Sequence, residues 1–160
     1  MKNVINQYEQ GGNKLRLAIR GLTPEDLLWV PPADAGVGLW SIQQIVIHLQ
    51  DSDLIGAARM KQMIAETNPQ IVGYDESKFA SELLCDEQSA DDAMLLFDVN
   101  RRQFARVLRK LAPETFDRTG RHSERGEIKL GESLKAMVRH LDHHLKFVHE
   151  KRAKMGKEMW

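Results

Sequence analysis

Three histidines in this 160-residue chain have the spacing and the neighbours expected of metal ligands. The pair His140 and His144 stands four residues apart near the C-terminal end of the sequence. On an α-helix, side chains four residues apart project from the same face. The pair could therefore hold one ion, and His48 could supply a third nitrogen if it approaches from a neighbouring helix.

The helical period predicts which histidines lie beside the apolar face of their helix. Successive residues of an α-helix turn by about 100°. With Leu141 at the centre of the apolar face, His144 falls about 60° and His140 about 100° to the same side. His143 falls about 160° away and is expected to face solvent. In the earlier helix, His48 lies about 60° from the centre of the apolar face. The pair and His48 are thus predicted to border a core.

Imidazole is the commonest protein ligand of Zn²⁺, and three histidines leave a coordination position open for water or substrate. The spacing is not that of the HExxH zinc proteases, because Leu141 and Asp142 occupy the intervening positions where that motif has its glutamate. The pattern therefore predicts an open three-histidine metal site.

Other polar residues are weaker candidates. Asp51 and Asp53 follow His48 closely, so either could hydrogen-bond a ligand imidazole, and Asp51 could be a fourth ligand; exposed helix carboxylates are the alternative. His122 and Glu124 precede the last helix and could form an acid/base pair over the metal. A solvated loop is the plain alternative for these two.

Long amphipathic helices must position these residues. The apolar periodicity predicts helices over residues 4–20, from Ser41 to the Asn68-Pro69 pair, over 90–111 and over 130–154, with a short helix at 76–84. Ser41 and Gln44 have the pattern of a capping box. In the helix at 90–111, the side chains expected to point inward include Leu96, Phe104 and Val107. Residues 118–127 are predicted to form a polar loop, and no series of strands is expected.

Composition limits the class of protein. A chain of 160 residues suits one domain, 1–160, with a sizeable core. Acidic and basic residues balance at 23 each, and no basic stripe is interleaved with aromatic residues, so a nucleic-acid partner is not expected. Apolar runs are too short for a membrane span, and the first residues lack the apolar segment of a secretory signal. With a lone Cys85, these features predict a cytoplasmic protein.

The sequence resembles the DinB-like superfamily. The similarity lies in the block that runs from Trp40 through His48 to Asp53, in the segment 120–130, and in the closing His140-x-x-His143-His144. The segment 120–130 resembles the YfiT branch, a group of metal-dependent hydrolases. The resemblance implies an all-α, up-up-down-down type of four-helix bundle with long connections, commonly dimeric. It also implies that His48, His140 and His144 bind a divalent ion, zinc or nickel.

Two departures from the family pattern concern substrate specificity rather than the metal. Asp53 stands where the family often has glutamate, and Lys129 stands where it often has a capping threonine. The leading hypothesis is a metal-dependent hydrolase acting on a small molecule through metal-bound water. The alternatives are a thiol-dependent S-transferase or isomerase of the same superfamily, and a non-catalytic, metal-binding, stress-associated dimer.

Overall fold

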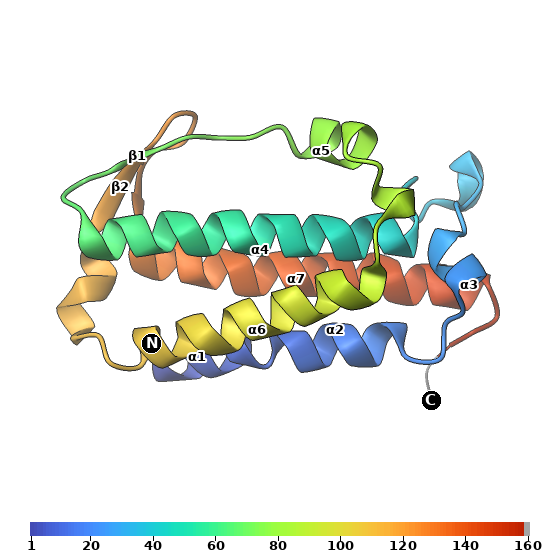
Figure 1. Cartoon of the computed structure of the whole chain (residues 1–160), viewed down its shortest axis with the longest axis horizontal. Coiled ribbons are helices and arrows are strands. Elements are labelled where there is room, and N and C mark those ends of the chain that lie inside the picture. Colours follow the sequence, from blue (N-terminus) through green and yellow to red (C-terminus); the bar gives the residue numbers. More distant parts are fainter. Residues whose placement is uncertain (159–160) are drawn as a thin grey trace.

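The computed structural model describes residues 1–158; Met159 and Trp160 of the predicted 1–160 domain lie outside the described residues. Long helices run along one axis of the molecule (Figure 1). The α-helices are α1 (Lys2–Glu9), α2 (Gly11–Ile19), α3 (Pro24–Leu28), α4 (Ile42–Ala65), α5 (Glu76–Glu82), α6 (Ala90–Leu108) and α7 (Leu130–Lys154). The 3₁₀ turns are Ala33–Ala35, Cys85–Glu87 and Pro113–Asp117. The prediction of a helical bundle is confirmed.

The bundle has four helical segments, two running in each direction: α1 with α2, α4, α6 and α7. Following the colours of Figure 1, α1 with α2 runs in the same direction as α7, and α4 runs with α6 in the opposite direction. In chain order the directions are therefore up, down, down, up, which differs from the up-up-down-down order that the resemblance implied, while the four-helix bundle itself is as expected. Because α4 and α6 are parallel, the connection between them must return along the whole bundle. This return segment carries α5 and lies over α4 (Figure 1).

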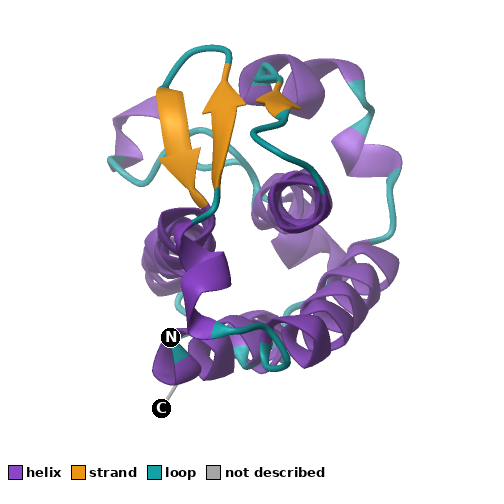
Figure 2. Cartoon of the chain, turned by 90° about the vertical axis from the view of Figure 1, so that its left-hand side faces the viewer, coloured by secondary structure: helices purple, strands orange, loops and turns teal. Residues whose placement is uncertain are grey.

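A small sheet covers one end of the bundle (Figure 2). Strands β1 (Gln70–Ile71), β2 (Thr119–His122) and β3 (Gly126–Lys129) form it in the order β1-β2-β3. β1 is parallel to β2, and β2 is antiparallel to β3. The prediction of a polar loop over 118–127 was therefore wrong. The hairpin lacks the apolar alternation of a strand, and its pairing instead depends on β1 and on a turn in which Gly126 has φ +70°.

The predicted helix over 4–20 divides at Gln10 into α1 and α2. The reason is the close approach of α6. A Cβ on Gly11 would lie 2.2 Å from Nη1 of Arg101, and one on Gly12 would lie 2.1 Å from Oδ1 of Asp98. The two glycines, which interrupt the apolar pattern of this helix, therefore leave room for the side chains of α6.

α6 begins at Ala90, as predicted, but ends at Leu108 rather than at Leu111. Phe104 is buried as predicted. The inward assignment of Leu96 and Val107 was wrong, since their exposed fractions are 51% and 43%. The buried face of α6 is narrower than the apolar stripe of its sequence.

The core has two apolar clusters at the two ends of the bundle. A buried polar network also joins the helices: Nε of Arg101 on α6 donates to Oδ1 of Asp53 on α4 at 2.8 Å, and both side chains are fully buried. Arg101 also donates to the carbonyl of Met137 on α7. None of the helices within residues 1–158 is both long and apolar enough to cross a membrane.

Candidate metal centre

The three predicted histidines meet in the crevice between α4 and α7. Nε2 of His140 lies 3.1 Å from Nε2 of His48 and 3.1 Å from Nε2 of His144. The possible ligand atoms of all three residues lie within 4.8 Å of one another. His143 is exposed, as the helical period predicted. The sequence prediction that these three imidazoles share one place is confirmed.

Local sequence explains how α4 and α7 present these rings. Ser41 accepts a hydrogen bond from the backbone N–H of Gln44, and the side chain of Gln44 accepts from the N–H of Ser41, so the predicted capping box begins α4. His48 then falls on the buried side of the helix, two turns from its start. On α7 the histidine pair is one turn apart, so both rings point toward α4.

The geometry fits a divalent ion. Nitrogen ligands at about 2.0–2.1 Å from a zinc ion lie about 2.8–3.0 Å from one another at octahedral angles and about 3.3–3.4 Å at tetrahedral angles, and the observed 3.1 Å falls between these values. Hydrogen bonds between neutral imidazoles cannot satisfy both contacts, because Nε2 of His140 carries either one N–H or one lone pair and can pair with only one neighbour. A cation between the three Nε2 atoms would accept all three lone pairs.

The protonation of the cluster also suits metal binding. Burial, followed by the charge of a neighbouring imidazole, lowers the pKa of His48, His140 and His144 to about 4. The rings are therefore neutral near pH 7, which is the form that binds metal. Nδ1 of His144 is buried without a hydrogen-bond partner among residues 1–158, so no polar group there fixes the ring.

Aromatic packing fixes His144 instead. The indole of Trp40 is parallel to the imidazole of His144, with an interplanar angle of 4° and centroids 6.2 Å apart. Trp40 also packs against His48, with centroids 5.0 Å apart. Trp40 also packs against the apolar cluster at this end of the bundle. It therefore joins the core to two of the candidate ligands.

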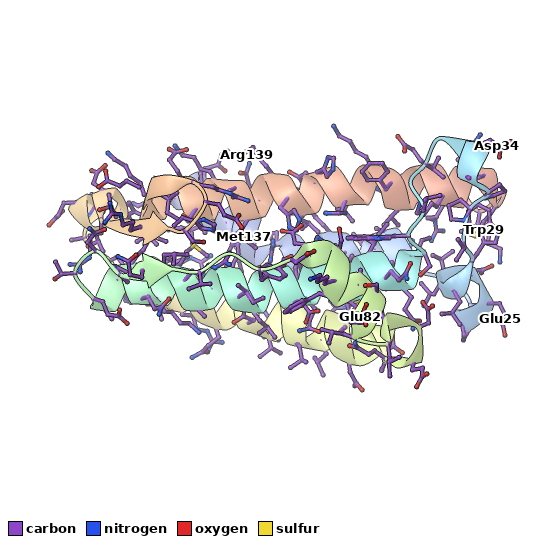
Figure 3. The ribbon with its side chains drawn as sticks, turned by 90° about the horizontal axis from the view of Figure 1, so that it is seen from above. Glu25, Trp29, Asp34, Glu82, Met137 and Arg139 are labelled. Atoms are coloured by element: carbon purple, nitrogen blue, oxygen red, sulfur yellow. The ribbon has the colours of Figure 1, made fainter. Side chains whose placement is uncertain are left out.

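Glu76 is the site residue that sequence reasoning missed. It is the first residue of α5, which Asp75 caps by accepting the N–H of Lys78. Its Oε2 lies 4.0 Å from Nε2 of His48, and its side chain is 48% exposed. α5 lies over α4 in the views from the side and from above (Figures 1 and 3). The carboxylate is thus brought to the cluster by the return segment. The sequence predicted the short helix there, but not that this helix lies over α4.

The two aspartates near His48 lie in different surroundings. The carboxylate of Asp53 accepts hydrogen bonds from Arg101 at Oδ1 and from Asn100 at Oδ2. Asp51 is half-buried, accepts from Gln50, and lies outside the group of three residues that could hold a metal. Burial raises the pKa of Asp51.

His122 and Glu124 lie in the β2–β3 hairpin. Nδ1 of His122 accepts the backbone N–H of Glu124. His122 lines a hollow beside the one that His140 lines, and the two hollows share Gly56 and Arg59 among their walls. Burial, then the positive charges of neighbouring arginines, lower the pKa of His122.

Known proteins are similar to this chain over most of its length. A protein of Oceanobacillus iheyensis named "Putative metal-dependent hydrolase" is 32% identical over 141 residues, covering 88% of this chain and 79% of that protein. A protein of Bacillus mycoides with the same description is 31% identical over 140 residues, covering 88% of this chain and 78% of its own length.

A solved structure has the same fold. YfiT from Bacillus subtilis, described as "a probable metal-dependent hydrolase with an unusual four-helix bundle topology", matches with a TM-score of 0.88 and 26% identity. The match covers 97% of this chain and 87% of that one. The family model of the DinB superfamily matches residues 7–148, and the chain therefore belongs to the DinB superfamily.

Proposed function

We propose that this protein is a metal-dependent hydrolase whose divalent ion is held by His48, His140 and His144. The observation that carries the proposal is the convergence of three neutral Nε2 atoms at the edge of a cleft. When bound, such an ion supplies Lewis acidity and a nucleophilic water at neutral pH. Zinc and nickel both accept imidazole nitrogens, and we propose one of them.

The residues around the cluster supply positioning and proton transfer. Trp40 holds the ring of His144 by stacking. Glu76 is proposed to take the proton of the attacking water and pass it to the leaving atom. In that reaction a C–O bond forms to the acyl carbon, the bond from that carbon to the leaving group breaks, and the water's two protons end on the two products.

His122 and Glu124 are the alternative acid/base pair. His122 lines the adjoining hollow, where it would face the distal part of a bound substrate, and Glu124 lies two residues further along the hairpin. The contact of Glu76 with His48 favours Glu76 for the proton next to the metal. Asp51 is proposed to influence the ligands through α4 rather than to bind the ion.

The remaining expectations concern the context of the activity. A small-molecule substrate suits the modest volume of the cleft, about 360 Å³. A homodimer in the cytoplasm, without nucleic acid as partner, is what we propose for the intact protein. Sedimentation of the purified chain measures directly whether it is a dimer.

Metal content after purification without a histidine tag tests the metal site. The wild type should carry about one zinc or nickel per chain, and the His140→Ala/His144→Ala variant should carry almost none. The matched control is His143→Ala/His149→Ala, which removes two exposed imidazoles from the same helix. Equal metal content in the wild type and the first variant would mean that the site does not exist.

A substrate panel then tests the reaction. The metal-loaded protein is assayed with esters, amides and thiol-conjugation substrates, with the metal-free protein beside it. Metal-dependent ester or amide cleavage supports the hydrolase. If turnover requires a thiol co-substrate, the protein is a thiol-dependent transferase rather than a hydrolase. A protein that melts far lower without metal and turns over no substrate would have a structural ion.

A further inference from the structure

A cleft of about 360 Å³ opens beside the histidine cluster, and its walls come from four parts of the chain. α4 contributes Ser52 and Arg59, and the return segment contributes Tyr74 and Glu76. The β2–β3 hairpin contributes Arg125, and α7 contributes residues between Ala136 and His143. Ser52 and Tyr74 close one side through a hydrogen bond of 2.6 Å between their hydroxyls. Any substrate that reaches His140 from this side must pass these walls.

Three arginines face this cleft: Arg59 from α4, Arg125 from the β2–β3 hairpin and Arg139 from α7. All three also line the adjoining hollow that contains His122, whereas His140 lines only the first. The arginines therefore lie between His122 and the histidine cluster. Arg139 is labelled in Figure 3, on the stretch of α7 that lies alongside α4.

Within the described part of the chain, carboxylates act on these arginines only from beyond 4.0 Å, with Glu76 and Glu124 near Arg59 and Glu132 near Arg139. None of the three forms an ion pair within 4.0 Å there. Arg59 donates one N–H to the carbonyl of Val72 and lies over the ring of Tyr74 at 5.6 Å. Glu76 is the carboxylate on the walls of this cleft, and it lies at the histidine end. On the walls of this cleft three arginines thus stand against one carboxylate, and Glu132 lies on the wall of the adjoining hollow.

The surroundings of this charge favour an anionic ligand. Arg59 is half-buried, and burial lowers its pKa, so its guanidinium has lost part of its hydration. A partly desolvated guanidinium gains more from an anion than an exposed one does. The contact with Tyr74 and Val72 also fixes the group before a ligand arrives, which reduces the entropy lost on binding.

We propose that Arg59, Arg125 and Arg139 bind an oxyanion of the substrate, so that the enzyme acts on small molecules that carry a carboxylate or a phosphate group. Guanidinium groups match both oxyanions with paired N–H donors. An anion held there leaves the rest of the molecule free to reach toward His140. This inference rests on the proposed hydrolase function, because it names the substrate of the same site.

Binding to the metal-free full-length chain tests the inference without any assay of activity. The probes are succinate, inorganic phosphate and the neutral succinamide, each titrated at low ionic strength and followed by calorimetry and by NMR shifts of arginine side chains. Succinate or phosphate should bind and shift Arg59, Arg125 and Arg139, and succinamide should not. The oxyanion that binds more tightly identifies the group on the substrate.

The test variant is Arg59→Gln/Arg125→Gln/Arg139→Gln, and the matched control is Arg20→Gln/Arg106→Gln/Lys110→Gln, which removes the same charge outside the cleft. The first should weaken anion binding at least tenfold and the second less than twofold. The single variant Arg139→Gln, at an exposed position, repeats the test if the triple variant does not fold. Equal weakening by both triple variants, or equal binding of succinamide and succinate, overturns the proposal.

Failure of this inference can be told apart from failure of the metal site. Anion binding is measured without metal and again in His140→Ala/His144→Ala, where it should persist. Metal content is measured in the arginine variant, where it should equal that of the wild type. Loss of anion binding alone leaves the hydrolase proposal standing, whereas loss of metal alone leaves the anion site standing.

Discussion

Oε2 of Glu76 lies 4.0 Å from Nε2 of His48, although the two residues belong to different helices and 27 residues separate them in the chain. α4 presents His48 from within the bundle, and α5 presents Glu76 from the return segment that lies over it. A carboxylate at this distance can receive a proton from a water at the cluster without displacing an imidazole from it.

Replacing Glu76 with glutamine should separate catalysis from metal binding. Glutamine keeps the size of the side chain but cannot accept the proton, so kcat on the substrate found by the panel should fall by about 10²–10⁴-fold. Metal content should stay that of the wild type. Glu82→Gln, at the other end of α5 and labelled in Figure 3, is the control and should keep full activity.

Two other results are informative for Glu76. If metal is lost with the glutamine variant, Glu76 is a ligand rather than a proton acceptor. If activity persists there but disappears in His122→Asn, proton transfer belongs to the hairpin pair.

Removing Trp40 should weaken metal binding. Nδ1 of His144 has no hydrogen-bond partner among residues 1–158, so ring packing orients it, and Trp40 is the ring that lies parallel to it. Loss of groups that orient ligands typically costs 10–100-fold in metal affinity, and we expect Trp40→Ala to fall in that range. Competition with a coloured chelator measures the affinity.

Trp40→Phe should retain part of the affinity, because a smaller ring can still pack on His144. Trp29→Ala serves as the control, since Trp29 follows α3 away from the cluster. An unchanged affinity in Trp40→Ala would mean that the helix alone orients the histidine.

The difference between His48 and Glu76 explains how much of this site could be predicted from the sequence. His48, His140 and His144 lie on helices whose faces follow from a local period, and the family pattern contains all three. Glu76 reaches the cluster only because α4 and α6 are parallel, which forces a long return over the bundle. The hairpin at 119–129 depends in the same way on β1, a partner about fifty residues earlier in the chain, and no local pattern reports that pairing.

The metal-free protein should lose stability as the pH falls. The folded-state pKa of about 4 for each ligand histidine is below the ordinary value of about 6.5, so the unfolded chain takes up protons first. Above about pH 6.5 there is no effect, and between about 6.5 and 4 the free energy of unfolding should fall by up to about 1.4 kcal/mol per pH unit for each histidine, and by less where their titrations are coupled. Urea unfolding of chelator-treated protein measures this slope.

The same titration on His140→Ala/His144→Ala separates the cluster from the other carboxylates and histidines. With two of the three imidazoles removed, the slope between about pH 6.5 and 4 should become shallower. A slope identical to that of the wild type would assign the acid sensitivity to groups outside the cluster.

The buried pair of Asp53 and Arg101 should dominate the stability of the bundle. Asp53→Asn leaves the guanidinium of Arg101 buried without a counter-charge, and breaking such a pair costs about 3–5 kcal/mol. Because Arg101 also donates to the carbonyl of Met137 on the helix that carries His140, metal affinity should fall as well. Urea unfolding and chelator competition give the two quantities.

An exposed ion pair provides the control for this last prediction. Lys14 and Asp142 are 42% and 48% exposed, so Asp142→Asn should cost no more than about 1 kcal/mol. Replacing both buried partners, as in Asp53→Leu/Arg101→Met, should recover much of the stability lost by Asp53→Asn, because no unpaired charge remains. If the double variant is stable but still binds metal poorly, the pair serves chiefly to hold α7 in register with α4. A double variant no more stable than Asp53→Asn would mean that packing around these side chains, rather than their charge, accounts for the loss.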